Sequence, residues 1–348
     1  MRWDWRAFLG LAVSVLLIWW VLRDVDAAEV WREVGGANWW LLLAAVAVAT
    51  SGFLTRALRW KVFLQPLHAE SKLSNRFAAV NIGFAANNLL PARAGEFVRA
   101  WSISRLEPVT VSGAVGSLVA ERFLDAVAVF TLLGVSMLHP AFPSTATITG
   151  RSVESVVLGL LVVMMAVFLG LIGLLFVPGS LLARAGGLTR FVPGHPHRRL
   201  RDLARSFIQG LESLRNPRLF LVGLAWSLGI WAWNGVSFWL AFLAFGIDQS
   251  YATALFVQAV ISLGVSVPSA PGYFGTFHAA AVIGLHEVYG VAEEATLAFA
   301  FGYHLAGFFP VTLLGLWYAG RIGLSISDLG HAEEVVEEDI HEHPMEDP

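Results

Sequence analysis

Apolar stretches long enough to cross, or nearly cross, a bilayer recur along the whole chain. They cover residues 7–22, 39–58, 76–90, 113–138, 153–177, 218–246, 251–267, 273–289 and 295–319. Of the 348 residues, 56% are apolar and only 14% are charged, too few to cover a soluble surface. The sequence therefore predicts an all-α polytopic membrane protein with about eight membrane segments of about 20 residues each. A soluble enzyme, a nucleic-acid-binding protein and a disordered scaffold are excluded.

The two ends of the chain differ in character. Arg2 and Arg6 precede the first apolar stretch, which reads as a signal peptide or a retained anchor. The Trp19-Trp20 pair is followed by no convincing small-residue cleavage site, which favours the anchor. Residues 1–320 carry a net charge of +5, and nine acids against one arginine give residues 321–348 a net charge of −8. We expect a transmembrane domain over 1–320 and a disordered acidic cytoplasmic tail over 321–348.

Basic residues set the orientation of the segments. Five Lys or Arg lie in 56–76 and seven Arg in 178–217, whereas loops 23–38 and 139–152 hold two and one. Cytoplasmic loops carry the excess of Lys and Arg, so the two loops with few basic residues are predicted to lie outside. Both termini are then cytoplasmic, and the membrane is the inner (plasma) membrane of the cell.

Two segments must start and end on the same side under this orientation. Residues 77–106 would return to the cytoplasm and residues 251–290 to the outside, each as a re-entrant hairpin broken by Pro and Gly. The hairpins align at an offset of 180 with six identities in 22 positions, including a Pro-x-x-x-Gly-x-Phe core. These features indicate an inverted repeat, with a coincidence between two unrelated loops as the alternative.

The predicted hairpins are interrupted by residues that end helices or permit tight turns, namely Pro91, Gly95, Pro268, Pro271, Gly272 and Gly275. Non-helical backbone at membrane depth is tolerated only where it is buried in protein or lines a watery cavity. The helix starts near Gly95 and Gly275 are expected to offer unpaired N–H donors to an anion. The alternative is a pair of Pro-kinked helices that only pack.

Ionisable side chains inside spans cost about 2.5–3.5 kcal/mol each, so they are candidate functional residues. The candidates for binding a substrate are Arg56, Arg59, Arg93, Glu96, Arg99, Glu121, Arg122, Asp125, Tyr273 and His278. Spacings of three and four predict helix-face pairs within 93–99 and within 121–125, serving either transport or helix register. For Arg56 and Arg59 the favoured interpretation is snorkelling, in which the charged end of the side chain reaches the membrane interface. Tyr273 and His278 read equally as packing residues.

Signatures of membrane enzymes are missing from the sequence. It holds no His-Glu-x-x-His, no Gly-x-Ser-x-Gly and no Walker loop. The absence of cysteine excludes disulfides, iron–sulfur clusters and thiol catalysis. His331, His341 and His343 are too loosely spaced to predict a metal site. We therefore expect binding and translocation rather than catalysis, with no cofactor and no metal.

Four segments occur in an order that resembles a known family: RALRW (56–60), NNLLPARAGEFVRAW (87–101), ERFLDAVAVF (121–130) and PGYFGTFH (271–278). Together they are similar to the flippase-like membrane domain of the lysylphosphatidylglycerol synthase transmembrane family, over residues 7–320. The last segment departs from the family pattern, because Tyr273 replaces a glycine and His278 stands near the usual acid.

The resemblance implies a protein that moves lipids between leaflets, with aminoacylated phosphatidylglycerol, polyprenyl-linked lipids or hopanoids as substrates of the family. The expected partners are lipids with anionic headgroups, and no nucleic acid. The soluble aminoacyl-transferase domain of full synthases is absent from this sequence, so we do not expect it to synthesise lysyl-lipid by itself. The alternatives are an accessory subunit of an enzyme that modifies envelope lipids and, less favoured, an uncharacterised membrane transferase.

Overall fold

The computed structural model describes residues 5–23, 25–90, 94–148, 150–175, 206–267 and 269–324. Regular structure in these ranges is helical, apart from strands β1 (Thr147–Ile148) and β2 (Arg151–Ser152), which pair antiparallel. The prediction of an all-α membrane-type fold is confirmed at this level. The predicted tail beyond residue 324, the arginine-rich part of loop 178–217 and the break residues Pro91 and Pro268 lie outside the described residues.

Three of the described helices are long and apolar enough to cross a membrane: α3 (Trp39–Leu64), α11 (Pro217–Ala244) and α14 (Glu293–Arg321). Their 26, 28 and 29 residues correspond to about 39–44 Å at 1.5 Å per residue, more than the hydrocarbon thickness of about 30 Å. Helix α6 (Val111–Met137) is as long but carries a cluster of charges. These lengths make the chain a multi-pass membrane protein.

The shorter helices fill the space around these four. They are α1 (Trp5–Leu22), α2 (Ala27–Gly36), α4 (Leu73–Leu89), α5 (Gly95–Leu106), α7 (Val153–Leu175), α10 (Glu212–Arg215), α12 (Tyr251–Gly264) and α13 (Thr276–Ala281), with a 3₁₀ turn η3 (Pro271–Tyr273) and a π-helical turn η4 (Val282–Glu287). Most predicted stretches match a helix to within a few residues. The number of membrane segments stays a prediction.

Helix α3 departs most from its predicted boundary, because it continues to Leu64 rather than ending at residue 58. The apolar pattern ends at Arg56 and Arg59, which led to the shorter prediction. The backbone hydrogen bonds of a helix do not depend on apolar side chains, so the helix can continue past these arginines. Arg59 and Trp60 are buried against neighbouring helices, which stabilises the added turns.

Polar caps set the start of the long helices. The side chain of Asn38 accepts hydrogen bonds from the first turn of α3, and Asn216 does the same for α11, where Pro217 occupies the first helical position. Thr110 caps α6 and Ser250 caps α12 in the same way. Four helices therefore begin where a short polar side chain satisfies otherwise unpaired N–H groups.

Helices α4 and α5 form the first predicted hairpin as an antiparallel pair. Asn75 near the start of α4 donates a hydrogen bond to the carbonyl of Leu106 at the end of α5, at 3.1 Å. At the other end Gly83 lies against Gly95, where an added Cβ would stand 2.1 Å from the Gly83 carbonyl oxygen. A Cβ on Gly83 would approach that of Arg99 to 2.7 Å. Glycine is thus required for this close approach.

Helices α12 and α13 form the second hairpin in the same antiparallel manner. A Cβ on Gly264 would stand 2.6 Å from that of Ala280, and further along Gly284 packs against Val257. The break between the helices turns at Gly272 and Gly275, whose φ angles of 70° and 90° favour glycine. That the two hairpins are re-entrant in the bilayer remains a prediction.

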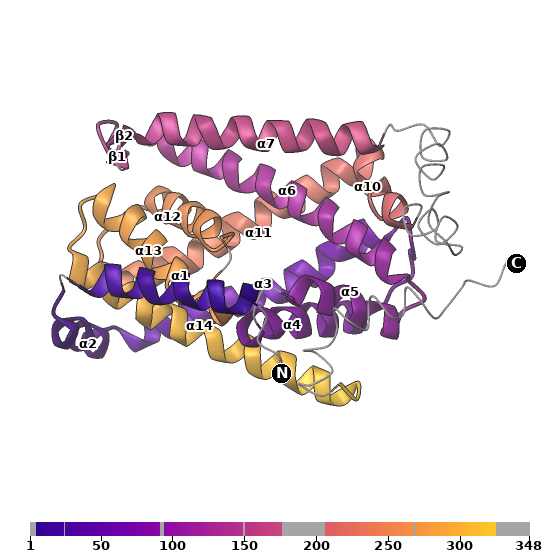
Figure 1. The fold of residues 1–348 in the computed structure, drawn as a ribbon, viewed down its shortest axis with the longest axis horizontal. Coiled ribbons are helices and arrows are strands. Elements are labelled where there is room, and N and C mark those ends of the chain that lie inside the picture. The colour runs from indigo at the N-terminus through magenta and orange to yellow at the C-terminus, as the bar shows by residue number, and fades with distance from the viewer. Residues whose placement is uncertain are drawn as a thin grey trace, which may run out of the picture.

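The helices of the two halves recur at a nearly constant spacing. Helices α3, α4, α5 and α6 start 178, 178, 181 and 182 residues before α11, α12, α13 and α14. Helix α3 packs against α11, α4 against α14, and α12 against α6, so exchanging the halves maps the α3–α11 pair onto itself and the α4–α14 pair onto α12–α6. Figure 1 shows α4 and α5 toward the right end and α12 and α13 toward the left end.

The connecting loops also group at the ends of the molecule. Helix α2 and the β1–β2 hairpin lie at the left end in Figure 1, and α10 lies at the right end. Loops 23–38 and 139–152 therefore share one end of the molecule, which agrees with the prediction that both lie on the same side of the membrane. The exposed Trp19, Trp39 and Trp40 flank α2, in keeping with an interfacial aromatic belt.

Candidate functional site

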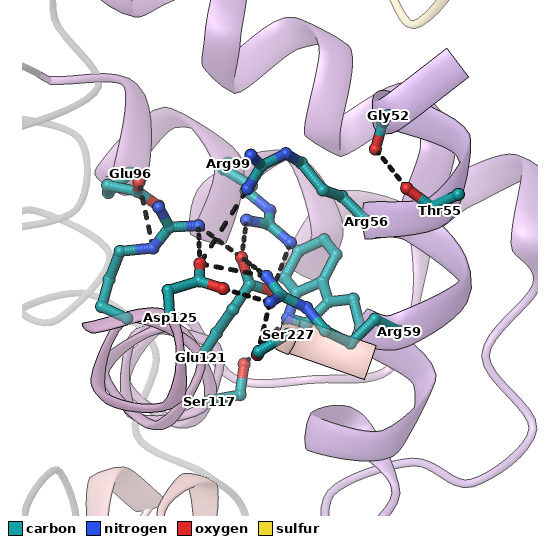
Figure 2. A network of polar contacts seen from close by, with 12 residues as sticks. Gly52, Thr55, Arg56, Arg59, Glu96, Arg99, Ser117, Glu121, Asp125 and Ser227 are labelled. Carbon is teal, nitrogen blue, oxygen red and sulfur yellow. Dashed lines mark hydrogen bonds and ion pairs between the residues drawn. The ribbon is translucent and has the colours of Figure 1, made fainter. Parts of the chain in front are cut away.

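Seven charged side chains from three helices of the first half meet in one network inside the protein (Figure 2). They are Arg56 and Arg59 of α3, Glu96 and Arg99 of α5, and Glu121, Arg122 and Asp125 of α6, referred to below as the charge network. Four arginines against three carboxylates give these residues a net charge of +1 (four minus three).

Glu121 is the centre of the charge network and is fully buried. Arg99 binds it through two parallel hydrogen bonds, with Nη1–Oε1 at 2.8 Å and Nη2–Oε2 at 2.9 Å. Arg59 lies 3.0 Å from the same carboxylate and Arg122 lies 2.5 Å from it. Each carboxylate oxygen therefore faces a guanidinium, the arrangement that makes a buried charge tolerable.

Asp125 is the second buried carboxylate and lies one helical turn after Glu121. Arg59 donates to both of its oxygens, and Arg122 lies 3.3 Å away. Arg56 is more distant, with Nη1 3.9 Å from Oδ2. The indole Nε1 of Trp231 on α11 also donates to Asp125, at 3.1 Å. Arg59 therefore bridges the two acids, which lie on one face of α6 as the spacing predicted.

Aromatic and hydroxyl groups fix the arginines in place. The guanidinium of Arg99 lies over the ring of Trp60, 4.0 Å from its centroid, a favourable cation–π distance. Trp60 in turn donates its Nε1 hydrogen to Ser117 Oγ at 3.1 Å. On the other side Arg59 donates to Ser227 Oγ of α11 at 2.8 Å. These contacts hold the arginines rigidly around Glu121.

One edge of the charge network is open while its centre is closed. The side chains of Arg122 and Glu96 remain 38% and 36% exposed, and the Arg122 Nε to Glu96 Oε1 distance is 3.7 Å. In the part of the chain that the structure describes, neither Arg122 Nε nor Glu96 Oε2 has a hydrogen-bond partner. Both atoms are themselves buried, so the unused hydrogen-bonding capacity lies beneath the exposed edge, and Figure 2 shows Glu96 at the margin of the network.

Several predicted pairings differ from those observed. We expected Glu96 to pair with Arg99 on one side of α5, but Glu96 faces Arg122 and Arg99 binds Glu121. The contact between Arg122 and Asp125 is as predicted. Arg93 lies outside the described residues. Arg99 pairs with Glu121 on another helix because Glu121 is buried, and a buried carboxylate needs guanidinium groups around it.

The favoured interpretation of Arg56 and Arg59 as snorkelling residues is wrong. Arg59 is fully buried and bridges two carboxylates, and the Arg56 side chain is only 12% exposed. The guanidinium of Arg56 lies between the rings of Phe84 and Trp231, at 5.4 and 5.6 Å from their centroids. Both arginines point into the protein, where fixed anions and aromatic faces surround their guanidinium groups.

The expectation of unpaired donors at the two helix starts is wrong for the N–H groups of Gly95 and Gly275. The Gly95 N–H donates to the side-chain oxygen of Asn87 at 2.9 Å. The Gly275 N–H approaches Nδ1 of His278 at 3.4 Å. Each hairpin thus satisfies this donor with its own side chain.

The polar residues of the second hairpin occupy an aromatic environment. His278 is fully buried, and its ring lies 4.0 Å from Phe301 and 5.3 Å from His304, centroid to centroid. Tyr273 has a φ of 62°, which a non-glycine residue rarely adopts. Tyr273 and His278, predicted in the same set of substrate-binding residues, lie in η3 and α13, whereas the charge network belongs to α3, α5 and α6.

Four residues of the site were not predicted: Trp60, Ser117, Ser227 and Trp231. Ser227 and Trp231 lie four apart on α11 and so share a face, the one sequence signal that could have indicated them. No spacing rule links them to Asp125, which is more than 100 residues away in the chain.

A groove of about 420 Å³ lies between α3 and α11, lined by Thr55, Val222, Ala225, Trp226, Gly229, Ile230 and Trp233. None of these residues carries a charge, so the groove offers apolar contact rather than a headgroup site. Within the described ranges, no group of three or more His, Asp or Glu side chains is placed to hold a metal ion.

The fold and the site define a multi-pass α-helical membrane protein with a buried charge network in its first half. The sequence pattern of the family described as "Lysylphosphatidylglycerol synthase TM region" matches residues 7–315. The chain belongs to this family, which confirms the resemblance seen in the four sequence segments.

Named relatives include a glycosyltransferase and two proteins named only for their membrane location. The chain is 27% identical to glycosyltransferase AglD of Haloferax volcanii, over 97% of this chain and 57% of that protein. Two UPF0104 membrane proteins of Methanothermobacter thermautotrophicus are 25% and 24% identical, over 78% and 91% of this chain and 82% and 95% of theirs. The chain thus spans little more than half the length of AglD but nearly all of a UPF0104 protein.

Proposed function

We propose that this protein moves an anionic phospholipid or a polyprenyl-phosphate-type lipid between the leaflets of the membrane, as a flippase or scramblase. The observation that carries the proposal is the charge network, with its closed centre at Glu121 and its open edge at Arg122 and Glu96. Packing alone would not require so many charges, because apolar residues of similar volume often stabilise a core equally well.

The chemistry of the network suits a lipid phosphate. Guanidinium groups bind phosphate oxygens through planar, two-point hydrogen bonds, and the Arg122 side chain is partly exposed at the open edge. The net charge of +1 among the described residues would be balanced by one negative headgroup. The headgroup would cross beside Arg122 while the acyl or prenyl chains remain in the bilayer.

The arrangement of the two halves supports a transport mechanism. The hairpins α4–α5 and α12–α13 occur at matching positions of halves whose helices start about 180 residues apart. In our proposal the halves are inverted repeats, the hairpins are re-entrant, and access alternates as one half moves against the other. Both termini lie in the cytoplasm, the membrane is the plasma membrane, and the protein catalyses no chemical reaction.

The proposal is tested with purified protein in liposomes that contain headgroup-labelled phosphatidylglycerol or labelled polyprenyl phosphate. A membrane-impermeant quencher reports how much label has reached the outer leaflet. We expect quenching well beyond half with the native chain and a return toward half with Arg122→Gln. Arg32→Gln is the matched control, because Arg32 is an exposed arginine paired with a carboxylate three residues away on α2.

Two results would contradict the proposal in different ways. Quenching that stops at half for the native chain with every lipid and ion gradient supplied would exclude transport by the protein alone. Equal quenching by Arg122→Gln and Arg32→Gln, both above half, would leave transport intact but exclude the open edge as its site.

A second candidate function is a non-transporting accessory subunit of an enzyme that modifies envelope lipids. It is favoured by the match that covers 97% of this chain but only 57% of a protein named as a glycosyltransferase. This candidate predicts stable co-purification with an enzyme and no lipid movement by the purified chain. Co-purification followed by a transport assay on the same sample distinguishes the two.

A further inference from the structure

Like Ser227, Trp231 of the second half reaches into the charge network. Trp231 lies on α11, its Nε1 donates to Asp125 Oδ1 at 3.1 Å, and its ring lies 5.6 Å from the Arg56 guanidinium. It therefore contacts both members of the longest ion pair of the network, in which Arg56 and Asp125 are 3.9 Å apart. Arg56 Nη1 has no hydrogen-bond partner among the described residues, so this pair is the most easily rearranged.

Trp231 is itself held by the second hairpin. Gln258 of α12 is 3% exposed, and its Nε2 donates to the backbone carbonyl of Trp231 at 2.9 Å. The Gln258 Oε1 accepts a hydrogen bond from Asn234 of α11 at 2.8 Å. The side-chain amide of Gln258 thus donates one hydrogen bond and accepts another, and both partners lie on the turn of α11 that carries Trp231. A buried amide with both groups engaged fixes the relative position of two helices.

We infer that Trp231 is a positioning residue through which the second hairpin sets the positions of Asp125 and Arg56. The inference rests on the proposed transport function and adds a link between the halves. While Gln258 holds Trp231, the indole N–H binds Asp125 and the indole face lies near Arg56. A shift of α12 withdraws both contacts together, so that Arg56 can leave Asp125 and contact a headgroup phosphate.

The test compares two tryptophans of α11. Trp231→Phe keeps an aromatic ring near Arg56 but removes the N–H donor to Asp125. Trp233→Phe is the matched control, because Trp233 lies two residues further on and donates its N–H to Ser51 Oγ at 2.9 Å, a contact outside the charge network. The initial transport rate is measured against the mole fraction of labelled lipid. We expect Trp231→Phe to lower the half-saturating fraction about tenfold, since the hydrogen bond that helps to keep Asp125 and Arg56 together is lost and Arg56 is free to contact the headgroup.

Gln258→Leu tests the link to the hairpin. It is expected to lower the half-saturating fraction as well, and the double variant with Trp231→Phe should lower it no further than Trp231→Phe alone, because both changes break one chain of contacts. Effects that multiply in the double variant would show that Gln258 and Trp231 act independently. That result would overturn the inference.

A second readout does not depend on transport. The chain contains no cysteine, so Phe84→Cys places a unique thiol beside Arg56. In this background Trp231→Phe and Gln258→Leu should raise the rate of labelling by a water-soluble thiol reagent severalfold, and Trp233→Phe should not. Equal labelling in all three overturns the inference. If the native chain moves no lipid, the transport proposal fails and the labelling rates alone decide the inference.

Discussion

The contact between Arg99 and Glu121 gives the sharpest test of how the charge network is built. Both side chains are buried, and they share two hydrogen bonds of 2.8 and 2.9 Å. Glu121→Gln removes one negative charge and raises the net charge of the described network from +1 to +2. Removing one partner of a buried ion pair typically costs about 3–5 kcal/mol, because the other charge is left uncompensated.

The double variant should recover much of that loss. Removing Arg99 together with Glu121 returns the net charge to +1, with three arginines facing two carboxylates. Arg59 and Arg122 keep Asp125 as a partner in this variant. We therefore expect Arg99→Gln and Glu121→Gln to be strongly non-additive, with an interaction energy of about 2–3 kcal/mol, near the upper end for residues in direct contact.

The free energy of unfolding of the native chain, the two single variants and the double variant is measured in mixed micelles, with fluorescence of the 14 tryptophans as the signal. The same four proteins are tested for transport, where all three variants should be inactive. Additive losses of stability would show that Arg99 and Glu121 do not form one buried pair. The reasoning about the network would then be refuted even if transport were lost.

Three further predictions concern the hairpins and the topology. Gly95→Ala should destabilise the protein by several kcal/mol, since its Cβ would stand 2.1 Å from the Gly83 carbonyl oxygen. The control Gly52→Ala, with nothing within 4 Å of its Cβ, should be neutral or stabilise the protein by up to about 1 kcal/mol. Equal melting temperatures for the two variants would contradict the close packing of Gly95. Gly275→Ala should lower the free energy of unfolding by about 1–3 kcal/mol or more, because φ is 90° and its Cβ would stand 2.8 Å from the Ser14 carbonyl oxygen. A melting temperature equal to that of the native chain would argue against this turn. Reporter tags on both termini should be protected from an external protease in intact cells, and digestion of either would reverse the predicted orientation.

The helices could be predicted from the sequence because each is specified by its own residues. Apolar runs and polar caps such as Asn38 and Asn216 act over a few residues, so most boundaries agree with the structure to within a few positions. The end of α3 was missed because Arg59 is compatible with a helix only when other segments supply Glu121 and Asp125. The candidate charges themselves were identified because an ionisable residue in an apolar span is unusual.

The sequence by itself determined a membrane protein of many helices, its two Pro- and Gly-broken hairpins and most of its charged residues, because hydropathy, helix caps and rare charges are local properties. Only the tertiary structure decided which charges pair. Glu96 faces Arg122 rather than Arg99, Arg59 turns inward, and Trp231 of the other half binds Asp125. Such partners lie on different helices, and the balance between burial and Coulomb attraction that selects them exists only once those helices have packed.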